Sequence, residues 1–195
     1  MPRRPRVYVP GYSSHVYQRG HNCCAVFHDE RDHEHFLLLV RQAALDNGVN
    51  IHAYALMKTH YHLLATPASR IGLPNAMKDI DGGYVRHYNR KYDRLGTVWC
   101  GRYKAKPIAD EDYWLTCLRY IELNPVEAGV VDDAAAYRWS SYGVHAFGRP
   151  ESWLATHPLY EELGSTPAGR QRAYREFCVL TLDGCQTPSS QGDGV

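Results

Sequence analysis

The fold is decided by Val49-Asn-Ile-His-Ala-Tyr-Ala-Leu-Met57, followed after Lys58-Thr59 by His60-Tyr-His-Leu-Leu-Ala-Thr66. Both halves carry apolar and β-prone residues on both faces, which is the pattern of strands in the middle of a sheet that is covered on both sides. The break at Lys58-Thr59 is either a turn between two strands or a kink in one extended segment. We therefore expect a buried sheet built around residues 49–66.

The segments around this core predict the order of the remaining elements. In chain order they are an interrupted strand over Val7–Gly11 and His15–Arg19, a helix capped by Asp29 that runs to about Leu45, a helix over Pro74–Tyr92 after an interruption at Gly82-Gly83, and an edge strand or extended arm over Thr97–Ile108. The order strand, helix, strand, strand, helix, strand matches the split βαβ plan. The prediction is an α+β, ferredoxin-like domain with a central antiparallel sheet.

The C-terminal third predicts further helices. Asp110 is a suitable N-cap for a helix through Leu123, and Pro125 is expected to end it. A helix over Gly169–Leu180 belongs to a C-terminal helical extension. We place the main α+β domain at residues 1–145, the helical extension of the same domain at 146–181, and a disordered tail at 182–195, where Gly, Gln, Ser, Pro and Asp dominate.

Composition excludes several classes of protein. The 195 residues are 44% hydrophobic and 22% charged, which is typical of a globular protein and not of a disordered or collagen-like one. No stretch reaches the roughly 20 apolar residues of a membrane span, and the basic start lacks the apolar run of a secretory signal. We expect a cytoplasmic protein with no membrane partner.

His60 and His62 form the first candidate site. Residues i and i+2 of a strand point to the same face, so both imidazoles can converge on one ion while Tyr61 points away. A metal site needs a third protein ligand. Without one, the pair is more often two ordinary polar or core residues.

Tyr120 and Asn124 form the second candidate site. At i and i+4 of a helix, the phenol and the amide lie on one face, about one turn apart. One rigid element could thus present a nucleophile together with a neutral oxygen ligand. A half-buried tyrosine and a C-terminal asparagine before proline would give the same pattern without any chemistry.

The third candidate is a basic, aromatic segment in the middle of a chain whose net charge is only +1. Aromatic faces stack on unpaired bases, while lysine and arginine follow the phosphates. A solvated helix face with core aromatics is the alternative. The candidate DNA-binding residues are Arg86, Arg90, Lys91, Arg94, Trp99, Arg102, Tyr103 and Lys104.

The sequence resembles the single-tyrosine HUH transposases, in particular the REP-associated tyrosine transposases of bacteria. The motifs that carry the resemblance run from about Pro5 to Leu180 and include Pro10-Gly11, His15-Val16, Arg19-Gly20, His60-Tyr-His62, Gly101-Arg-Tyr-Lys104, Tyr120-Ile-Glu-Leu-Asn-Pro125, Ala128-Gly129 and Trp139-Ser-Ser-Tyr142. Lys58-Thr59 stands where the family usually has Pro-Asn.

The resemblance implies the roles of the candidate residues. His60, His62 and Asn124 would bind a divalent metal ion, Mg²⁺ or Mn²⁺, and Tyr120 would be the catalytic nucleophile. The implied function is metal-dependent cleavage and strand transfer of single-stranded or hairpin DNA through a covalent 5′-phosphotyrosine, by a monomer or a homodimer. Tyr84 and Tyr88 are rival nucleophiles.

Two other functions stay open at this point. The first is a domesticated protein that grips hairpin DNA or RNA without cutting it, which Lys58-Thr59 favours. The second is a metal-dependent hydrolase that activates a water molecule on the histidines.

Overall fold

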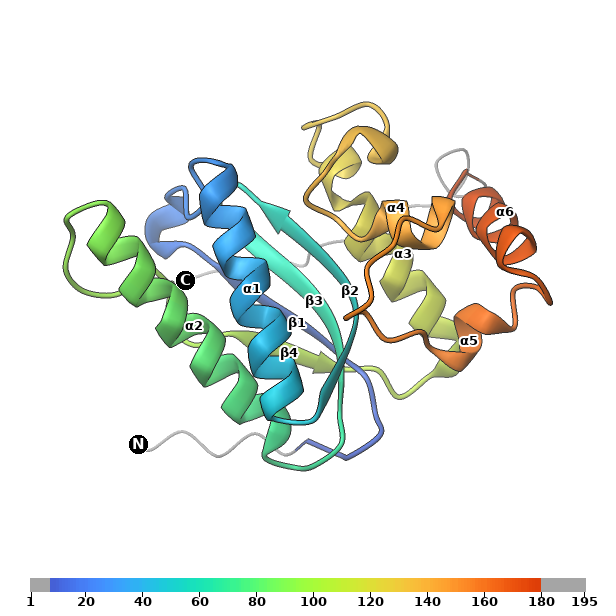
Figure 1. Cartoon of the computed structure of the whole chain (residues 1–195), viewed down its shortest axis with the longest axis horizontal. Helices are drawn as coiled ribbons and strands as arrows, with labels where there is room; N and C mark the ends of the chain where they lie inside the picture. Colours follow the sequence, from blue (N-terminus) through green and yellow to red (C-terminus); the bar gives the residue numbers. More distant parts are fainter. Residues whose placement is uncertain (1–7, 180–195) are drawn as a thin grey trace.

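The computed structural model describes residues 8–179, in which helices cover both faces of a four-stranded sheet (Figure 1). The strands are β1 (Ser14–Arg19), β2 (Val49–Met57), β3 (His60–Pro67) and β4 (Lys104–Pro107). The helices are α1 (Glu30–Asp46), α2 (Gly72–Lys91), α3 (Glu111–Glu127), α4 (Tyr142–Phe147), α5 (Pro158–Glu161) and α6 (Pro167–Val179), with short 3₁₀ turns at His21–Cys23 and Ala134–Ala136.

The sheet has the strand order β2-β3-β1-β4, and every neighbouring pair is antiparallel. Helix α1 connects β1 to β2 and α2 connects β3 to β4, so the two βαβ units are interleaved. This is the ferredoxin-like plan that the sequence predicted. Lys58-Thr59 forms the turn of the β2–β3 hairpin, in which Met57 pairs with His60.

The two faces of the sheet have different partners. Tyr61 and Leu63 of β3 belong to the core cluster on the side of α1 and α2, whereas Leu64 belongs to the cluster around α3. Because side chains alternate along a strand, His60 and His62 share the α3 face with Leu64. The strand thereby presents both imidazoles to α3 and keeps Tyr61 in the opposite core.

Helix α2 passes through Gly82-Gly83 without the predicted interruption. A Cβ atom on Gly83 would lie 2.9 Å from a methyl group of Leu39 in α1. The glycine therefore permits close contact between the two helices and does not mark a break. At the start of α1, the Asp29 side chain accepts a hydrogen bond from the Asp32 N–H, as expected of an N-cap.

Helix α3 continues past Pro125 to Glu127, so the prediction that this proline ends the helix is wrong. Proline removes one N–H group, but the next turn still forms because the Ala128 N–H donates to the Asn124 carbonyl. The chain leaves the helix at Gly129, whose φ is +64°. Asn124 consequently lies within regular helix, one turn after Tyr120.

Two extended segments are shorter than the sequence suggested. Residues 8–13 do not form a strand, and β1 begins at Ser14. Of the predicted arm over residues 97–108, only Lys104–Pro107 is a strand, while Trp99 makes a single bridge to Gly20.

The C-terminal helices α4 and α6 pack on α3. Tyr142, Tyr174 and Cys178 join Leu118 and Ile121 of α3 in one apolar cluster. A helical C-terminal part was predicted, and the proposed domain boundaries stay a prediction. The tail predicted at 182–195 lies outside the described residues. Among residues 8–179, no helix has both the length and the apolar character needed to cross a bilayer.

Candidate active site

Three histidines lie close together on the α3 face of the sheet, beside Tyr120. The rings of His60 and His62 lie with centroids 5.1 Å apart and nearly perpendicular, at 88°. His15, on the neighbouring strand β1, forms a 2.8 Å hydrogen bond between its Nε2 atom and Nδ1 of His62. This contact occupies one ring nitrogen of His62 and leaves Nε2 as the atom that can bind a ligand.

Tyr120 and Asn124 face these histidines from α3. The Asn124 Oδ1 atom lies 3.3 Å from Nε2 of His60. The half-buried ring of Tyr120 has its centroid 5.9 Å from that of His62 and 5.7 Å from that of His15, with both contacts edge-on. The structure thus brings together the four residues that the sequence singled out, although they come from two distant parts of the chain.

Burial keeps the histidines of the site neutral. It holds the pKa of His62 well below its usual value, and the adjacent His15 and His60 add to the effect. Burial and the charge of Lys106 lower the pKa of His15 to about 4. The pKa of His60 is lowered by burial, although the hydrogen bond to Asn124 acts in the opposite direction. Neutral imidazoles have a free lone pair, which a metal ligand requires.

The pKa of Tyr120 is shifted in the direction that disfavours its reactive form. Burial raises the pKa of its phenol, and the negative charge of Glu127 raises it further. The phenol is therefore protonated at neutral pH in this arrangement. A nucleophilic role needs a cation or a base beside the oxygen when substrate is bound.

The donor atoms of His60, His62 and Asn124 suit a divalent cation. A spacing of 3.3 Å between the His60 nitrogen and the Asn124 oxygen lets both reach one ion, because metal–ligand distances are about 2.1 Å. Within residues 8–179, no group of three or more His, Cys, Asp or Glu side chains is arranged to hold a metal ion. The candidate site has two histidines and an asparagine amide, so it is not a group of that kind.

The rival nucleophiles lie on the wrong side of the sheet. Tyr84 has no exposed surface and Tyr88 is 4% exposed, and both belong to the core around α1 and α2. The Tyr84 hydroxyl donates to the Val26 carbonyl. Neither phenol can meet the histidine pair on the α3 face.

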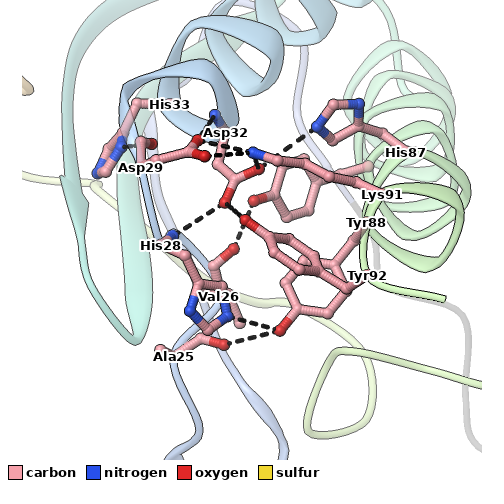
Figure 2. Close-up of polar contacts among 11 residues, drawn as sticks. Ala25, Val26, His28, Asp29, Asp32, His33, His87, Tyr88, Lys91 and Tyr92 are labelled. Atoms are coloured by element: carbon pink, nitrogen blue, oxygen red, sulfur yellow. Dashed lines mark hydrogen bonds and ion pairs between the residues drawn. The ribbon is translucent and has the colours of Figure 1, made fainter. Parts of the chain in front are cut away.

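Two of the predicted DNA-binding residues occupy positions that do not fit that role. Trp99 is only 3% exposed, and its Nε1–H donates to the Asp81 carbonyl. Lys91 forms 2.7 Å ion pairs with Asp29 and with the fully buried Asp32 (Figure 2). The sequence shows that these side chains are aromatic or charged, but it does not show that they already form a hydrogen bond or ion pairs within the protein.

The other predicted DNA-binding residues divide between two surfaces. Arg86 and Arg90 are exposed on α2 and, with His35 and His87, line a shallow hollow on the far side from Tyr120. Arg94 lies in the loop after α2, over the ring of Tyr88. Arg102 and Tyr103 lead into β4, which begins at Lys104.

Strand β4 brings two lysines to the α3 face of the sheet. Lys104 pairs with Tyr17 and Lys106 with His15 in the β1–β4 register, and paired residues share a face of the sheet. Lys106 belongs to the basic segment that the sequence predicted, but the third histidine, His15, was given no role from sequence. The signal that could have found His15 is the register of β1 against β3, which the sequence does not show.

A known protein family matches the part of the chain that carries these residues. The family model described as "Transposase IS200 like" matches residues 9–124, which is more than half of the chain and includes all four candidate residues. The matched family is one of transposases. The chain belongs to the IS200-like transposase family.

Solved structures provide a second comparison. A REP-associated tyrosine transposase, solved bound to a REP hairpin, superposes with a TM-score of 0.62 at 16% identity, over 80% of this chain and 93% of that one. A protein of Deinococcus radiodurans R1, described only as a proposed transposase, gives 0.43 at 20% identity, over 57% and 89%. No curated protein matches this chain.

Proposed function

We propose that this protein cuts and rejoins single-stranded DNA by a metal-dependent transesterification in which Tyr120 becomes covalently linked to a 5′-phosphate. The observation that carries the proposal is the approach of α3 to β3. Tyr120 lies beside His62, and Asn124, one turn further along, contacts His60. A nucleophile and three ligand side chains therefore meet on one face of the sheet.

His60, His62 and Asn124 are the residues that would hold Mg²⁺ or Mn²⁺. Such an ion, when bound, would polarise a non-bridging oxygen of the scissile phosphate and favour the phenolate. The chain itself supplies the alignment. His15 contacts Nδ1 of His62, and the Thr59 hydroxyl lies 3.1 Å from Nδ1 of His60, so Nε2 of each ring is the atom that could bind the ion.

The proposed reaction exchanges one phosphodiester bond for another and therefore needs no external energy source. The Tyr120 oxygen bonds to phosphorus, the bond from phosphorus to the 3′ oxygen breaks, and that oxygen takes up a proton and leaves as a 3′-OH. A second 3′-OH can reverse the step, which restores the phenol and joins new ends, because the ester bond is conserved throughout.

Hairpin-forming DNA is the proposed substrate. The support is the similar fold of a transposase that was solved with a REP hairpin, together with the lysines that β4 places beside the site. Cations on an edge strand can follow the phosphates of a strand that lies across Tyr120.

The test is formation of a denaturation-resistant protein–DNA adduct. We expect protein mixed with a hairpin-bearing oligonucleotide to form the adduct with Mg²⁺ or Mn²⁺, and to lose it with a chelator or in Tyr120→Phe. Tyr113→Phe, an exposed tyrosine on the same helix, is the matched control and should keep it. An adduct that persists in Tyr120→Phe would show that another residue is the nucleophile.

The same assay separates the two alternative functions. Tight binding without an adduct in either metal, over several hairpins, would identify a binding protein that does not cut. Release of a free 5′-phosphate without an adduct would identify a hydrolase.

A further inference from the structure

Glu122 is a fully buried carboxyl group in the middle of the helix that carries the nucleophile, between Tyr120 and Asn124. Two residues along a helix correspond to a rotation of about 200°. Its side chain therefore points away from the histidines and toward α4 and α6. The proposed chemistry makes no use of this group.

Three donors satisfy the Glu122 carboxyl group. Oε1 is hydrogen-bonded to the Ser141 hydroxyl and, at 2.7 Å, to Nδ1 of His145, and Oε2 accepts from the Tyr174 hydroxyl at 2.7 Å. Burial and the nearby Glu122 charge hold the pKa of Tyr174 well above its usual value, so its hydroxyl stays a donor. A buried acid with all its partners in place is a rigid anchor.

Ser141 links this anchor to the sheet. Its hydroxyl accepts from the Tyr54 N–H of β2 at 2.9 Å, and its own N–H donates to the Tyr54 carbonyl at 3.0 Å. Tyr54 pairs with Leu63 of β3, the residue next to His62. A continuous chain of hydrogen bonds thus joins α3 to the strand pair that carries the histidines.

This second connection matters because the first one lies inside the site. On the catalytic side, the polar contact between α3 and β3 is the 3.3 Å approach of Asn124 to His60. Phosphate and cation must enter at that point and replace the contact. The connection through Glu122 lies on the other side of α3 and can persist while the site is occupied.

We propose that Glu122 is a positioning residue, which fixes α3 to β2 through Ser141 and so sets the approach of Tyr120 to the histidine pair. This inference rests on the proposed function of Tyr120. It also assigns a role to Trp139-Ser-Ser-Tyr142, because this segment runs beside β2 and supplies the serine.

The first test compares matched hydroxyl deletions. Tyr174→Phe and Ser141→Ala each remove a donor to Glu122, whereas Tyr160→Phe removes a 2.7 Å hydrogen bond to the His145 carbonyl in the same cluster. We expect the first two to slow single-turnover cleavage at saturating DNA by about 10-fold, with an unchanged Kd for DNA, because a small misplacement of a reacting group is costly. The cleavage rate of Tyr160→Phe should stay within about 2-fold of the wild-type rate, even if this variant loses as much thermal stability as Tyr174→Phe.

Equal slowing in Tyr160→Phe, or a wild-type rate in Tyr174→Phe, would overturn the positioning role. Should Ser141→Ala fail to fold, Tyr174→Phe decides, since it removes only one hydroxyl.

The second test does not depend on activity. Amide hydrogen exchange of the DNA-free protein should be faster in α3 of Tyr174→Phe than in α3 of Tyr160→Phe, with β3 equally protected in both. Identical exchange in α3 would contradict the inference. If the wild-type protein forms no adduct at all, the proposed function fails, and the exchange measurement still decides whether Glu122 holds the helix.

Discussion

His62 is surrounded by aromatic rings, with His15 hydrogen-bonded to one of its nitrogens and the Tyr120 ring nearly perpendicular to its own. Histidines that bind metals are commonly fixed through their other nitrogen, which sets both the tautomer and the orientation of the ring. His15 fills that position for His62, and the Thr59 hydroxyl does so for His60. We therefore expect the Thr59 hydroxyl to orient the ring of His60.

Thr59→Val tests this role. Valine keeps the shape of the side chain but removes the hydroxyl beside Nδ1 of His60, so we expect the affinity for Mn²⁺ to fall by about 10-fold. Isothermal titration calorimetry of the DNA-free protein with Mn²⁺ measures the change in affinity. Thr59→Ser retains the hydroxyl and should bind as the wild type does. Equal affinity in all three proteins would show that the hydroxyl does not orient His60.

Residue patterns placed each candidate pair on one face, and the resemblance implied that the two pairs act together, but neither identified their surroundings. The spacing of His60 and His62 on a strand and of Tyr120 and Asn124 on a helix placed each pair on one face, and the structure brings the two pairs together. His15 received no role because its place beside His62 depends on how β1 pairs with β3. Spacing within one element can be derived from sequence, whereas contacts between elements cannot.

At the scale of elements, a cluster of polar contacts joins the start of α1 to the end of α2 (Figure 2). Burial opposes ionisation of Asp32, but hydrogen bonds from Lys91, the His28 N–H and the Tyr92 hydroxyl outweigh it and lower the pKa of Asp32 to about 2. The cluster holds together the two helices that cover one face of the sheet.

Lys91→Met should destabilise the protein by about 2 kcal/mol at pH 7, because it leaves a buried carboxylate with fewer partners. The Asp32 pKa in the folded protein is below its ordinary value of 3.8, so its contribution to stability is fully present above pH 3.8 and is lost as the pH falls toward 2. The difference between wild type and variant should therefore shrink over that range. Denaturant unfolding at several pH values measures it.

Lys78→Met, at an exposed position of the same helix, is the control and should change the free energy of unfolding by less than about 0.5 kcal/mol. A Lys91→Met variant as stable as this control would show that the ion pair contributes nothing to stability.

Signals for the ends of helices were less reliable than signals for their existence. Gly82-Gly83 and Pro125 are typical helix breakers, yet α2 and α3 pass through them. At Gly83 the lack of a side chain lets Leu39 of α1 pack against α2, because a Cβ atom would lie 2.9 Å from a Leu39 methyl group. Such a requirement comes from tertiary packing, so a local pattern cannot reveal it.

At the scale of the whole molecule, the basic residues lie on two different surfaces, one on each side of the sheet. The α3 face carries Tyr120 and, along β4, Lys104 and Lys106, whereas Arg86 and Arg90 lie on the outer side of α2. The sequence suggested a single basic patch because these cations are close along the chain. Fold class followed from the order of elements, but the division of charges between the faces required the structure.

Lys106→Ala should weaken DNA binding and reduce the slope of log K against log salt concentration by about 1, because one contact with a phosphate is lost. Arg86→Ala should leave the single-turnover cleavage rate at saturating DNA unchanged, since Arg86 lies on the other face. Fluorescence anisotropy at several salt concentrations, together with adduct kinetics, measures both effects. A cleavage defect in Arg86→Ala would mean that DNA at the active site also contacts α2.

The most direct test of the proposed chemistry is to identify the residue that becomes attached to DNA. The protein is trapped on a hairpin oligonucleotide in Mn²⁺, digested, and analysed by tandem mass spectrometry. We predict a single modified peptide with a 5′-phosphodiester on Tyr120. A nucleotide attached to Tyr17, Tyr84 or Tyr113, or cleaved DNA with a free 5′-phosphate and no modified peptide, would contradict it.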